Sequence, residues 1–359
     1  MPRPIRATID PAAFRHNYLV AKRAAGKARA WAVIKANAYG HGLLTCAEAV
    51  RDVADGYAML DFAEAVRLRE AGFKQPILLL EGAFEPADIA EAGRLGLSLA
   101  VHDLEQIRML ETEHAAPLDL FLKLNTGMNR LGFAPADARM LVERLRASGA
   151  AKSLAVMTHF ARADDDAGIS DALARFDAAV AGLDLPQSVA NSAALLRFPE
   201  AARDWVRPGI MLYGGSPMPS RASAEALGLK PAMQLESRII AVQEIAAGES
   251  VGYGARFTAD RPTRVGVVAC GYADGYPRHA MTGTPILVDG QRTRTLGTVS
   301  MDMMACDLSA LPGAGVGSRV VLWGKGLPAD EVATAAGTIS YELFCALAQR
   351  VPQGLGTVA

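Results

Sequence analysis

The chain has 359 residues, of which 51% are hydrophobic and 21% are charged, an ordinary composition for a globular protein. Its formal net charge of -1 gives no electrostatic reason to expect binding to nucleic acid or to a membrane surface. Four scattered cysteines without a CxxC pair, and six dispersed histidines without an HExxH motif, indicate reduced thiols and no metal site.

The chain begins with MPRPIRATID, which lacks the apolar core of a signal peptide, and no uncharged apolar run reaches the length of a membrane span. We therefore expect a cytoplasmic protein that does not insert into a membrane. At about 150 residues per domain, the length favours two domains, or one large barrel with a smaller unit.

Eight short, nearly continuous apolar segments follow in the first two thirds of the chain. They are 31–35, 56–60, 76–82, 97–101, 118–124, 153–160, 187–191 and 205–214. Apolar residues at helical spacing predict helices at 137–148 and 171–183, and Asp103 with Gln106 resembles a capping box. Eight such strands separated by helices predict a parallel (β/α)8 TIM-type barrel over 8–226. The alternative, an open doubly wound sheet, should carry a GxGxxG turn, and the sequence has none.

Beyond the barrel the pattern changes to short strands with turn residues between them, which predicts a mostly β domain over 227–359. The Asp-Gly dipeptide at 289–290 is typical of a two-residue hairpin turn. Two helical pieces are expected at 329–336 and 340–349. The β-like N-terminal residues 1–7 precede the barrel, and we expect them to add a strand to this second domain.

Unusual polar residues and glycine-containing loops follow the predicted barrel strands at their carboxyl ends, where the functional residues of this fold collect. These positions are Lys35, Arg130, His159, Asn191, Ser192, Arg207, Gly209 and Ile210. Each has a purely structural interpretation, such as a solvated lysine, a hydrogen-bonded core histidine, a surface ion pair or a helix N-cap. Their shared position at one rim favours a functional interpretation.

The loops after the seventh and eighth strands commonly bind phosphate in this fold. An anion held there by Ser192, Gly209 and Ile210 would face Lys35 across the barrel mouth. A phosphate anchor and a lysine of lowered proton affinity suggest a Schiff base to a phosphorylated carbonyl compound. Two hypotheses fit. In a pyridoxal phosphate enzyme Arg207 would face the pyridine nitrogen, and in a class I aldolase it would grip a second phosphate.

The motif AVIKANAYGHG resembles the cofactor-lysine motif of the alanine racemases, and the resemblance extends over the whole chain. Eight further blocks match in the same order: KLNTGMNRLGF, THFA, ANSAA, VRPGIMLYG, VGYGARFTA, GYADGYPR, TVSMDMM and ISYEL. The family implies an isomerase of fold type III that uses pyridoxal 5'-phosphate to interconvert L-alanine and D-alanine. It also implies a homodimer with shared active sites, and a role in supplying or consuming D-alanine for peptidoglycan.

By the same resemblance, Lys35 is the lysine that bonds covalently to the cofactor and one of two catalytic bases. Arg207 would face the pyridine nitrogen. The second base is Tyr253, which acts on the opposite face of the substrate Cα and comes from the β domain of the partner subunit; His159 and Arg207 would help to polarise it. The residues implied for the cofactor phosphate are Tyr39, Ser192, Gly209, Ile210 and Tyr341.

The resemblance assigns the substrate carboxylate to Arg130 and to the backbone N–H of Met301, and it places Tyr272 at the entrance. Lys123 matches a lysine that some members of the family carry as a carbamate, which steadies the arginine. Asn125 stands where many relatives have an aspartate. This departure affects the local charge near Arg130 and leaves the assignment of the two bases unchanged.

Three other functions of similar proteins stay open at this point. A single-domain cofactor carrier would lack the β domain and Tyr253. A fold-type III decarboxylase should be longer and should carry a cysteine motif in its substrate pocket. A broad-specificity racemase acting on serine or basic amino acids would differ in the size of the pocket around Tyr272 and Tyr341, which the sequence does not give.

Overall fold

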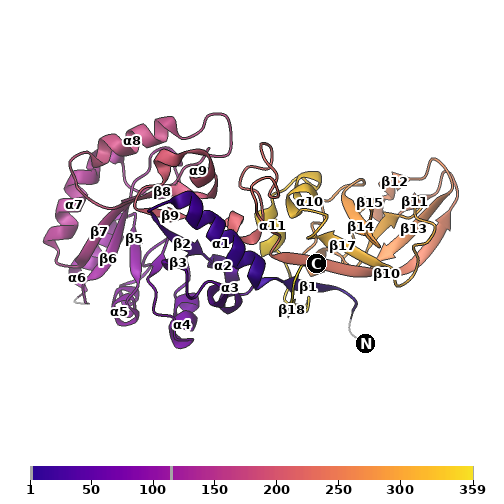
Figure 1. Ribbon diagram of the computed structural model, residues 1–359, viewed down its shortest axis with the longest axis horizontal. Helices are drawn as coiled ribbons and strands as arrows, with labels where there is room; N and C mark the ends of the chain where they lie inside the picture. The colour runs from indigo at the N-terminus through magenta and orange to yellow at the C-terminus, as the bar shows by residue number, and fades with distance from the viewer. Residues whose placement is uncertain (1–2, 114–115, 359) are drawn as a thin grey trace.

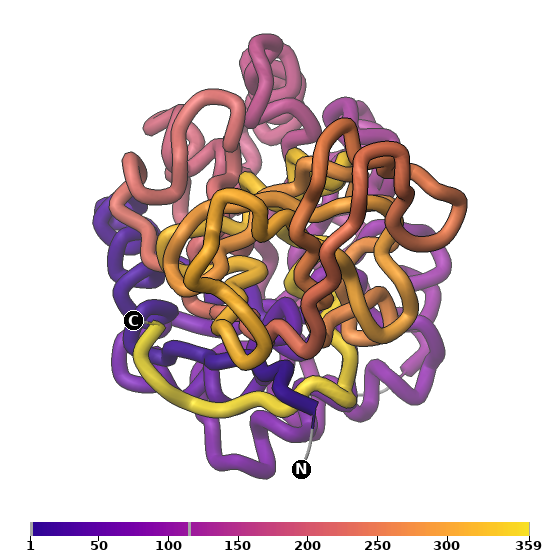
Figure 2. Tube along the Cα trace, turned by 90° about the vertical axis from the view of Figure 1, so that its right-hand side faces the viewer, coloured from indigo at the N-terminus to yellow at the C-terminus, as the bar shows by residue number. Residues whose placement is uncertain are grey.

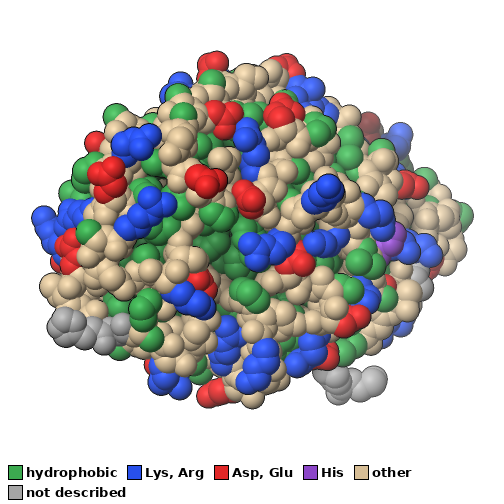
Figure 3. Space-filling view, turned by 60° about the vertical axis from the view of Figure 1, so that its left-hand side comes forward, with side chains coloured by type: hydrophobic (Ala, Val, Ile, Leu, Met, Phe, Trp, Pro, Cys, Tyr) green, Lys and Arg blue, Asp and Glu red, His purple; other side chains and the backbone are tan. Residues whose placement is uncertain are grey.

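The computed structural model describes residues 3–113 and 116–358, and it places a barrel and a mostly β domain at opposite ends of the long axis (Figure 1). Figure 2 shows the molecule from the end that carries the β domain, which lies in front of the barrel. On the barrel end, Lys and Arg side chains alternate with Asp and Glu, so this face has no large patch of one charge (Figure 3). Among the described residues, no helix combines the length and the apolar character that a membrane crossing requires.

Eight parallel strands close the barrel in chain order, and the last of them returns to pair with the first. The strands are β2 (Arg29–Val33), β3 (Gly56–Met59), β4 (Ile77–Leu79), β5 (Ser98–Val101), β6 (Leu118–Lys123), β7 (Ala151–Met157), β8 (Gln187–Asn191) and β9 (Trp205–Arg207). The predicted TIM-type barrel is therefore confirmed. Four predicted strands run at least two residues past the observed ends, since β2 ends at Val33, β4 at Leu79, β7 at Met157 and β9 at Arg207. Pro208 has no N–H to donate after β9, and Ile210–Tyr213 forms the short 3-10 helix η3 instead.

Aromatic side chains from the barrel strands β2, β6 and β9 pack against one another. The rings of Trp31 and Trp205 stack with centroids 4.0 Å apart, and Phe121 meets Trp31 edge-on at 6.0 Å. Gly56 makes room for them, because a Cβ there would lie 2.3 Å from the Trp31 ring. This dense packing supports the sheet.

Helices cover the outside of the barrel, each with a buried apolar face. They are α1 (Pro11–Ala25), α3 (Leu43–Ala49), α4 (Phe62–Glu70), α5 (Pro86–Leu95), α6 (Leu104–Thr112), α7 (Ala138–Ala147), α8 (Ser170–Val180) and α9 (Ser192–Arg197), with short 3-10 turns η1 (Pro135–Asp137) and η2 (Pro199–Ala201). The helices predicted at 137–148 and 171–183 are confirmed as α7 and α8. The predicted capping box is only half right. Asp103 caps α6, but Gln106 Oε1 accepts the N–H of His102, one residue before the cap.

The second domain is built on one antiparallel sheet whose long strand β10 pairs with both β17 and β13, so that part of the sheet closes on itself. Its elements are β10 (Met233–Ile245), β11 (Ser250–Val251), β12 (Phe257–Thr258), β13 (Thr263–Val268), β14 (Pro285–Val288), β15 (Gln291–Leu296), β16 (Met304–Asp307), β17 (Arg319–Trp323), β18 (Gln353–Leu355), α10 (Ala329–Ala336) and α11 (Ser340–Cys345), with turns η4 (Tyr253–Ala255) and η5 (Tyr272–Asp274). The predicted hairpin is confirmed, with positive φ at Asp289 and Gly290 between β14 and β15. The second helical piece is shorter than predicted, since α11 ends at Cys345.

The strand β1 (Arg6–Ile9) joins the sheet of the second domain before the chain enters the barrel. It runs antiparallel to β10, with Ala7 opposite Leu235, and parallel to β18. Met1, Pro2 and Ala359, which fall within the predicted segments 1–7 and 227–359, lie outside the described residues. The domain boundary at 226/227 itself stays a prediction.

Candidate functional site

A cavity of about 890 Å³ opens at the carboxyl ends of the barrel strands, between the barrel and the segment that contains α10 and α11. Its size is that of a typical small-molecule site. It is lined by ten of the thirteen residues with a predicted role: Lys35, Tyr39, Lys123, Arg130, His159, Ser192, Arg207, Gly209, Ile210 and Tyr341. The other three, Tyr253, Tyr272 and Met301, lie on the second domain and do not line this cavity.

Lys35 lies directly after β2, at the start of the segment labelled α2 (Lys35–Tyr39). The backbone of the next four residues is left-handed, with φ values of 54°, 52°, 54° and 49° from Ala36 to Tyr39. Left-handed backbone costs about 1–2 kcal/mol for each residue with a Cβ, and strain of this kind collects at functional sites. Burial and the nearby charge of Arg130 lower the pKa of Lys35, so its amine is more readily deprotonated and nucleophilic than that of a surface lysine.

Gly40 fixes the end of this turn against the second domain. A Cβ at Gly40 would lie 2.3 Å from the carbonyl oxygen of Phe344 in α11, and its φ of 77° also favours glycine. The side chain of Gln353 donates to the Gly40 carbonyl at 3.1 Å. The barrel lysine and the residues of α11 are therefore held in a fixed relation.

Several hydrogen-bond donors gather at one end of the cavity. Ser192 begins α9 and Ile210 begins η3, so both helical segments open toward the same place. Ser192 Oγ accepts the N–H of Gly209 at 2.8 Å. A Cβ at Gly209 would lie 2.9 Å from Tyr39 Oη, so glycine leaves the room that this hydroxyl needs.

The phenols of Tyr39 and Tyr341 complete this end of the cavity, with ring centroids 5.9 Å apart. Among the residues that the structure describes, neither hydroxyl has a hydrogen-bond partner. Burial raises the pKa of both phenols, which keeps them protonated as donors. Two phenols, a serine hydroxyl and helix-start N–H groups fit a phosphate.

Arg207 ends β9 and is 5% exposed. Its Nη1 donates to the carbonyl and the hydroxyl of Ser188, both at 2.6 Å, and its Nη2 donates to the carbonyl of Thr158. Nη2 also lies 3.4 Å from His159 Nδ1, and since a guanidinium only donates, this imidazole nitrogen accepts. Burial lowers the pKa of Arg207 to about 10, so the side chain remains a cation at neutral pH.

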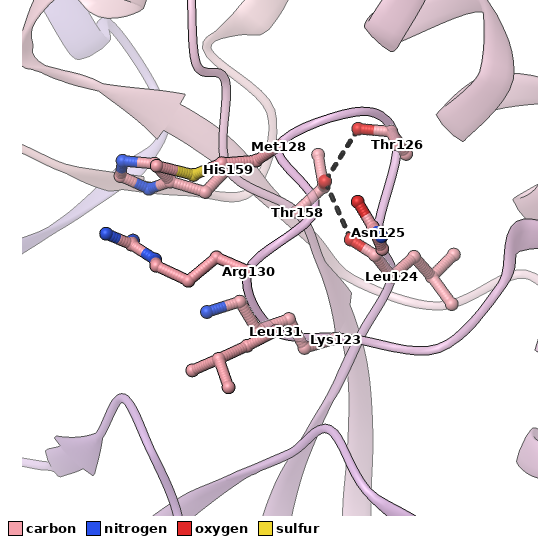
Figure 4. A pocket seen from close by; sticks show the side chains of 9 residues that line it. All are labelled: Lys123, Leu124, Asn125, Thr126, Met128, Arg130, Leu131, Thr158 and His159. Carbon is pink, nitrogen blue, oxygen red and sulfur yellow. Dashed lines mark hydrogen bonds between the residues drawn. The ribbon is translucent and has the colours of Figure 1, made fainter.

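Lys123, Arg130 and His159 point toward the same side of the loop that follows β6 (Figure 4). Burial and the charge of Arg207 lower the pKa of Lys123 to about 8. Burial and the same cation hold the pKa of His159 well below its usual range, so the imidazole is neutral. Arg130 forms no ion pair with a carboxylate in the described part of the chain. This end of the cavity is cationic and suits a carboxylate ligand.

Asn125 shapes the loop that carries Arg130. Its Oδ1 accepts the N–H groups of Gly127 and Asn129, and its Nδ2 donates to Asn129 Oδ1. These bonds hold Asn129 at a φ of 55°. An aspartate could accept the same two N–H groups but could not make the third bond, so the amide is used here for its donor.

The three predicted residues outside the cavity are exposed on the second domain. Tyr253 in η4 is 73% exposed, Met301 is 53% exposed and Tyr272 in η5 is 37% exposed. Tyr272 and Met301 lie on adjacent backbone segments, because the N–H of Tyr272 donates to Ser300 O at 3.0 Å and that of Ala273 to Met301 O at 2.9 Å. We call these three side chains the exposed tyrosine face.

The other residues that line the cavity include Glu81 and Cys345, for which no role was predicted. Glu81 follows β4, and its charge raises the pKa of Lys35 and Lys123 against the effect of burial. It is the polar residue near the end of the predicted segment 76–82, so the strand-end rule applied to that segment would have found it. Cys345, at the end of α11, also lines the cavity, and no sequence pattern indicated it.

Comparison with known proteins matches both parts of the chain. The family model described as alanine racemase, N-terminal domain, matches residues 9–217, and the model for the C-terminal domain matches 232–355. An alanine racemase of Nitrosospira multiformis is 55% identical over 98% of this chain and 99% of its own length. The biosynthetic alanine racemase of Pseudomonas aeruginosa has a TM-score of 0.96 at 49% identity, covering 99% and 100% of the two chains. An alanine racemase of Bartonella henselae, solved with covalently bound pyridoxal phosphate, has a TM-score of 0.89 at 27% identity, covering 99% and 100%.

Proposed function

The chain belongs to the alanine racemase family and interconverts L-alanine and D-alanine; we propose that it does so with pyridoxal 5'-phosphate bonded to Lys35 and with two bases on opposite faces of the substrate. One observation carries this proposal. Lys35, a cluster of anion donors and the buried cation Arg207 line the same cavity. The comparisons do not favour the broad-specificity alternative.

The residues present fit the cofactor. When bound, pyridoxal phosphate withdraws electrons from the substrate Cα and so makes its proton removable. The phosphate would be held by Tyr39, Ser192, Gly209, Ile210 and Tyr341. Arg207 would face the ring nitrogen, and because a guanidinium does not give up its proton, the ring nitrogen would stay unprotonated. The covalently bound pyridoxal phosphate in the Bartonella henselae relative supports this choice of cofactor.

Racemisation removes a proton from one face of Cα and returns one to the other face, so each face needs its own base. Lys35 Nζ, once the substrate amine has replaced it on the cofactor and left it free, would serve one face, and its lowered pKa suits that exchange. The hydroxyl of the partner subunit's Tyr253 would serve the other face. Arg130, together with the N–H of Met301 from the partner, would bind the carboxylate and orient Cα between the two bases.

The exposed tyrosine face supports a homodimer. Within one chain, Tyr253 is 73% exposed and lies outside the cavity that contains Lys35. The same domain also exposes Met281 at 69% and Met303 at 44%, and exposed apolar side chains of this kind are typical of an interface. We propose that two chains associate head to tail, so that each covers the cavity of the other with this face.

The cellular role is part of the same proposal. A reaction that makes or removes D-alanine would supply or consume it for peptidoglycan. All four cysteines are free, as expected in the reducing cytoplasm, where we place the enzyme.

Circular dichroism of the purified protein with L-alanine, L-serine and L-arginine in parallel tests the proposed function. We expect the signal of L-alanine to decay to zero while the other two change slowly. Lys35→Ala should abolish the decay. Failure of the cofactor-supplemented protein to racemise alanine, or a faster reaction with serine or arginine, would contradict the proposal.

A further inference from the structure

The left-handed turn from Ala36 to Tyr39 connects two proposed cofactor ligands, since Lys35 precedes it and Tyr39 ends it. Within it, the N–H of Ala38 donates to Ile34 O at 2.9 Å, and the N–H of Gly40 donates to Ala36 O at 3.1 Å. Successive non-glycine residues do not favour this conformation by themselves. Contacts from elsewhere in the fold must therefore stabilise it.

The N–H of Asn37, in the middle of the turn, donates to a side chain from another helix. Its acceptor is Glu64 Oε1 in the first turn of α4, at 2.6 Å. Helix α4 does not need this carboxylate for its own start, because Asp61 accepts the N–H of Ala63 at 2.7 Å. The side chain of Glu64 is thus directed at the turn rather than at its own helix.

The other carboxylate oxygen, Glu64 Oε2, is buried and forms no hydrogen bond within the described part of the chain. Burial also raises the pKa of Glu64. A half-buried carboxylate with one unpaired oxygen is unfavourable by itself. The hydrogen bond that Glu64 Oε1 accepts from the N–H of Asn37 explains why this side chain lies here.

The contact continues beyond the turn through the side chain of Asn37. Its Oδ1 accepts the N–H of Leu43 at 2.9 Å, at the start of α3, and its backbone carbonyl accepts the N–H of Gly42 at 2.9 Å. Glu64, Asn37 and Leu43 therefore connect α4, the turn and α3 in one chain of hydrogen bonds. Fixing Asn37 fixes the backbone on both sides of it.

We propose that Glu64 is a positioning residue for racemisation, which holds the Asn37 N–H and thereby directs Lys35 and Tyr39 into the cavity. Glu64 does not line the cavity, so it acts through the turn and touches neither substrate nor cofactor. The inference rests on the cofactor roles proposed above for Lys35 and Tyr39. Loss of the contact should weaken cofactor binding and lower kcat. It should leave the KM for alanine nearly unchanged, because Arg130, which we propose binds the substrate carboxylate, lies in a different loop, after β6.

The test compares Glu64→Ala, Glu64→Gln and the matched control Glu70→Ala, which alters an exposed glutamate of the same helix. Hydrogen exchange of the peptide over 36–43 is followed by mass spectrometry in the holoenzyme. Cofactor affinity is measured by titrating the cofactor-free enzyme with pyridoxal phosphate. We expect Glu64→Ala to speed exchange and to weaken binding about 10- to 100-fold, the effect of one hydrogen bond to a charged group. Glu64→Gln keeps an acceptor oxygen but loses the charge, so its affinity should lie between those of the parent and Glu64→Ala, whereas Glu70→Ala should stay within about threefold of the parent.

Exchange and affinity of Glu64→Ala within twofold of the parent would overturn the inference, as would a Glu64→Gln variant as weak as Glu64→Ala. If Glu64→Ala does not fold, the parent protein gives the answer, since the Asn37 amide must exchange far more slowly than an unpaired exposed amide. Faster exchange in Glu64→Ala with no cofactor binding in any protein would support the contact and reject the proposed function, so the two failures are distinguishable.

Discussion

Gly209→Ala is the substitution whose effect on the proposed phosphate site follows most directly from the geometry. The new Cβ would lie 2.9 Å from Tyr39 Oη and 3.7 Å from Tyr39 Cζ. Tyr39 is 6% exposed, and its ring stacks on Tyr213 with centroids 4.5 Å apart. The phenol therefore has little room to move, and overpacking of this kind costs about 1–3 kcal/mol of stability.

The same clash should weaken cofactor binding. A Tyr39 hydroxyl forced away from Gly209 would lose the hydrogen bond that we propose it donates to the phosphate, a bond to a charged group worth about 1.5–3 kcal/mol. That is about 10- to 150-fold in affinity.

The assay titrates the cofactor-free enzyme with pyridoxal phosphate and follows the absorbance of the bound cofactor. Thermal unfolding of the same cofactor-free samples measures the stability cost separately. Gly313→Ala is the matched control, because no atom lies within 4 Å of its added Cβ and its φ is not in the left-handed region. A Gly209→Ala enzyme that binds the cofactor within twofold of the control would refute the reasoning.

Three further predictions follow from the site. Lys35→Ala should abolish the yellow colour of the bound cofactor; colour that persists and that borohydride fixes on another lysine would refute the assignment. Tyr253→Phe should slow deuterium exchange at the Cα of L-alanine far more than at that of D-alanine, measured by NMR, whereas equal losses would argue against opposed bases. Burial and Arg207 lower the pKa of Lys123 from 10.5 to about 8, so the unfolded chain binds more protons between these pH values and stability should rise with pH across them. In carbonate-free buffer Lys123→Met should reduce that rise, leaving the part that comes from Lys35, whose pKa burial also lowers; an unchanged pH profile by urea titration would count against the lowered pKa of Lys123.

The sequence predicted the barrel because each strand is a short apolar run, and burial on both faces leaves that signal in the residues themselves. It also placed Lys35 at the end of the first strand and Arg207 in the last. The strand-end rule then brought together eight residues far apart in the chain, and all eight line one cavity. The loops after the last two strands also indicated an anion site at Ser192, Gly209 and Ile210. The roles of Tyr39, Tyr341 and Tyr253 came from the family resemblance, because a phenol has no spacing that indicates chemistry.

The sequence could not predict the left-handed turn, because Ala36 and Ala38 favour right-handed helix and only tertiary contacts such as that of Glu64 reverse this preference. The strand predicted at 205–214 was too long for a similar reason. The apolar residues of η3 read as a strand, and their buried 3-10 conformation depends on packing against the rest of the barrel. Glu81 was missed although the rule that found Lys35 also applied to it.

Subunit complementation tests the central claim most directly, since it asks whether Lys35 and Tyr253 act in one site from two chains. Lys35→Ala and Tyr253→Phe chains carrying different tags are co-expressed, and racemisation of L-alanine is measured on the mixture. If the sites are shared, half of the dimers are mixed and each has one intact site, so we expect about one quarter of the parent activity from two variants that are each nearly inactive. Activity no greater than the sum of the two separate variants, in a sample shown by its tags to contain mixed dimers, would contradict the account.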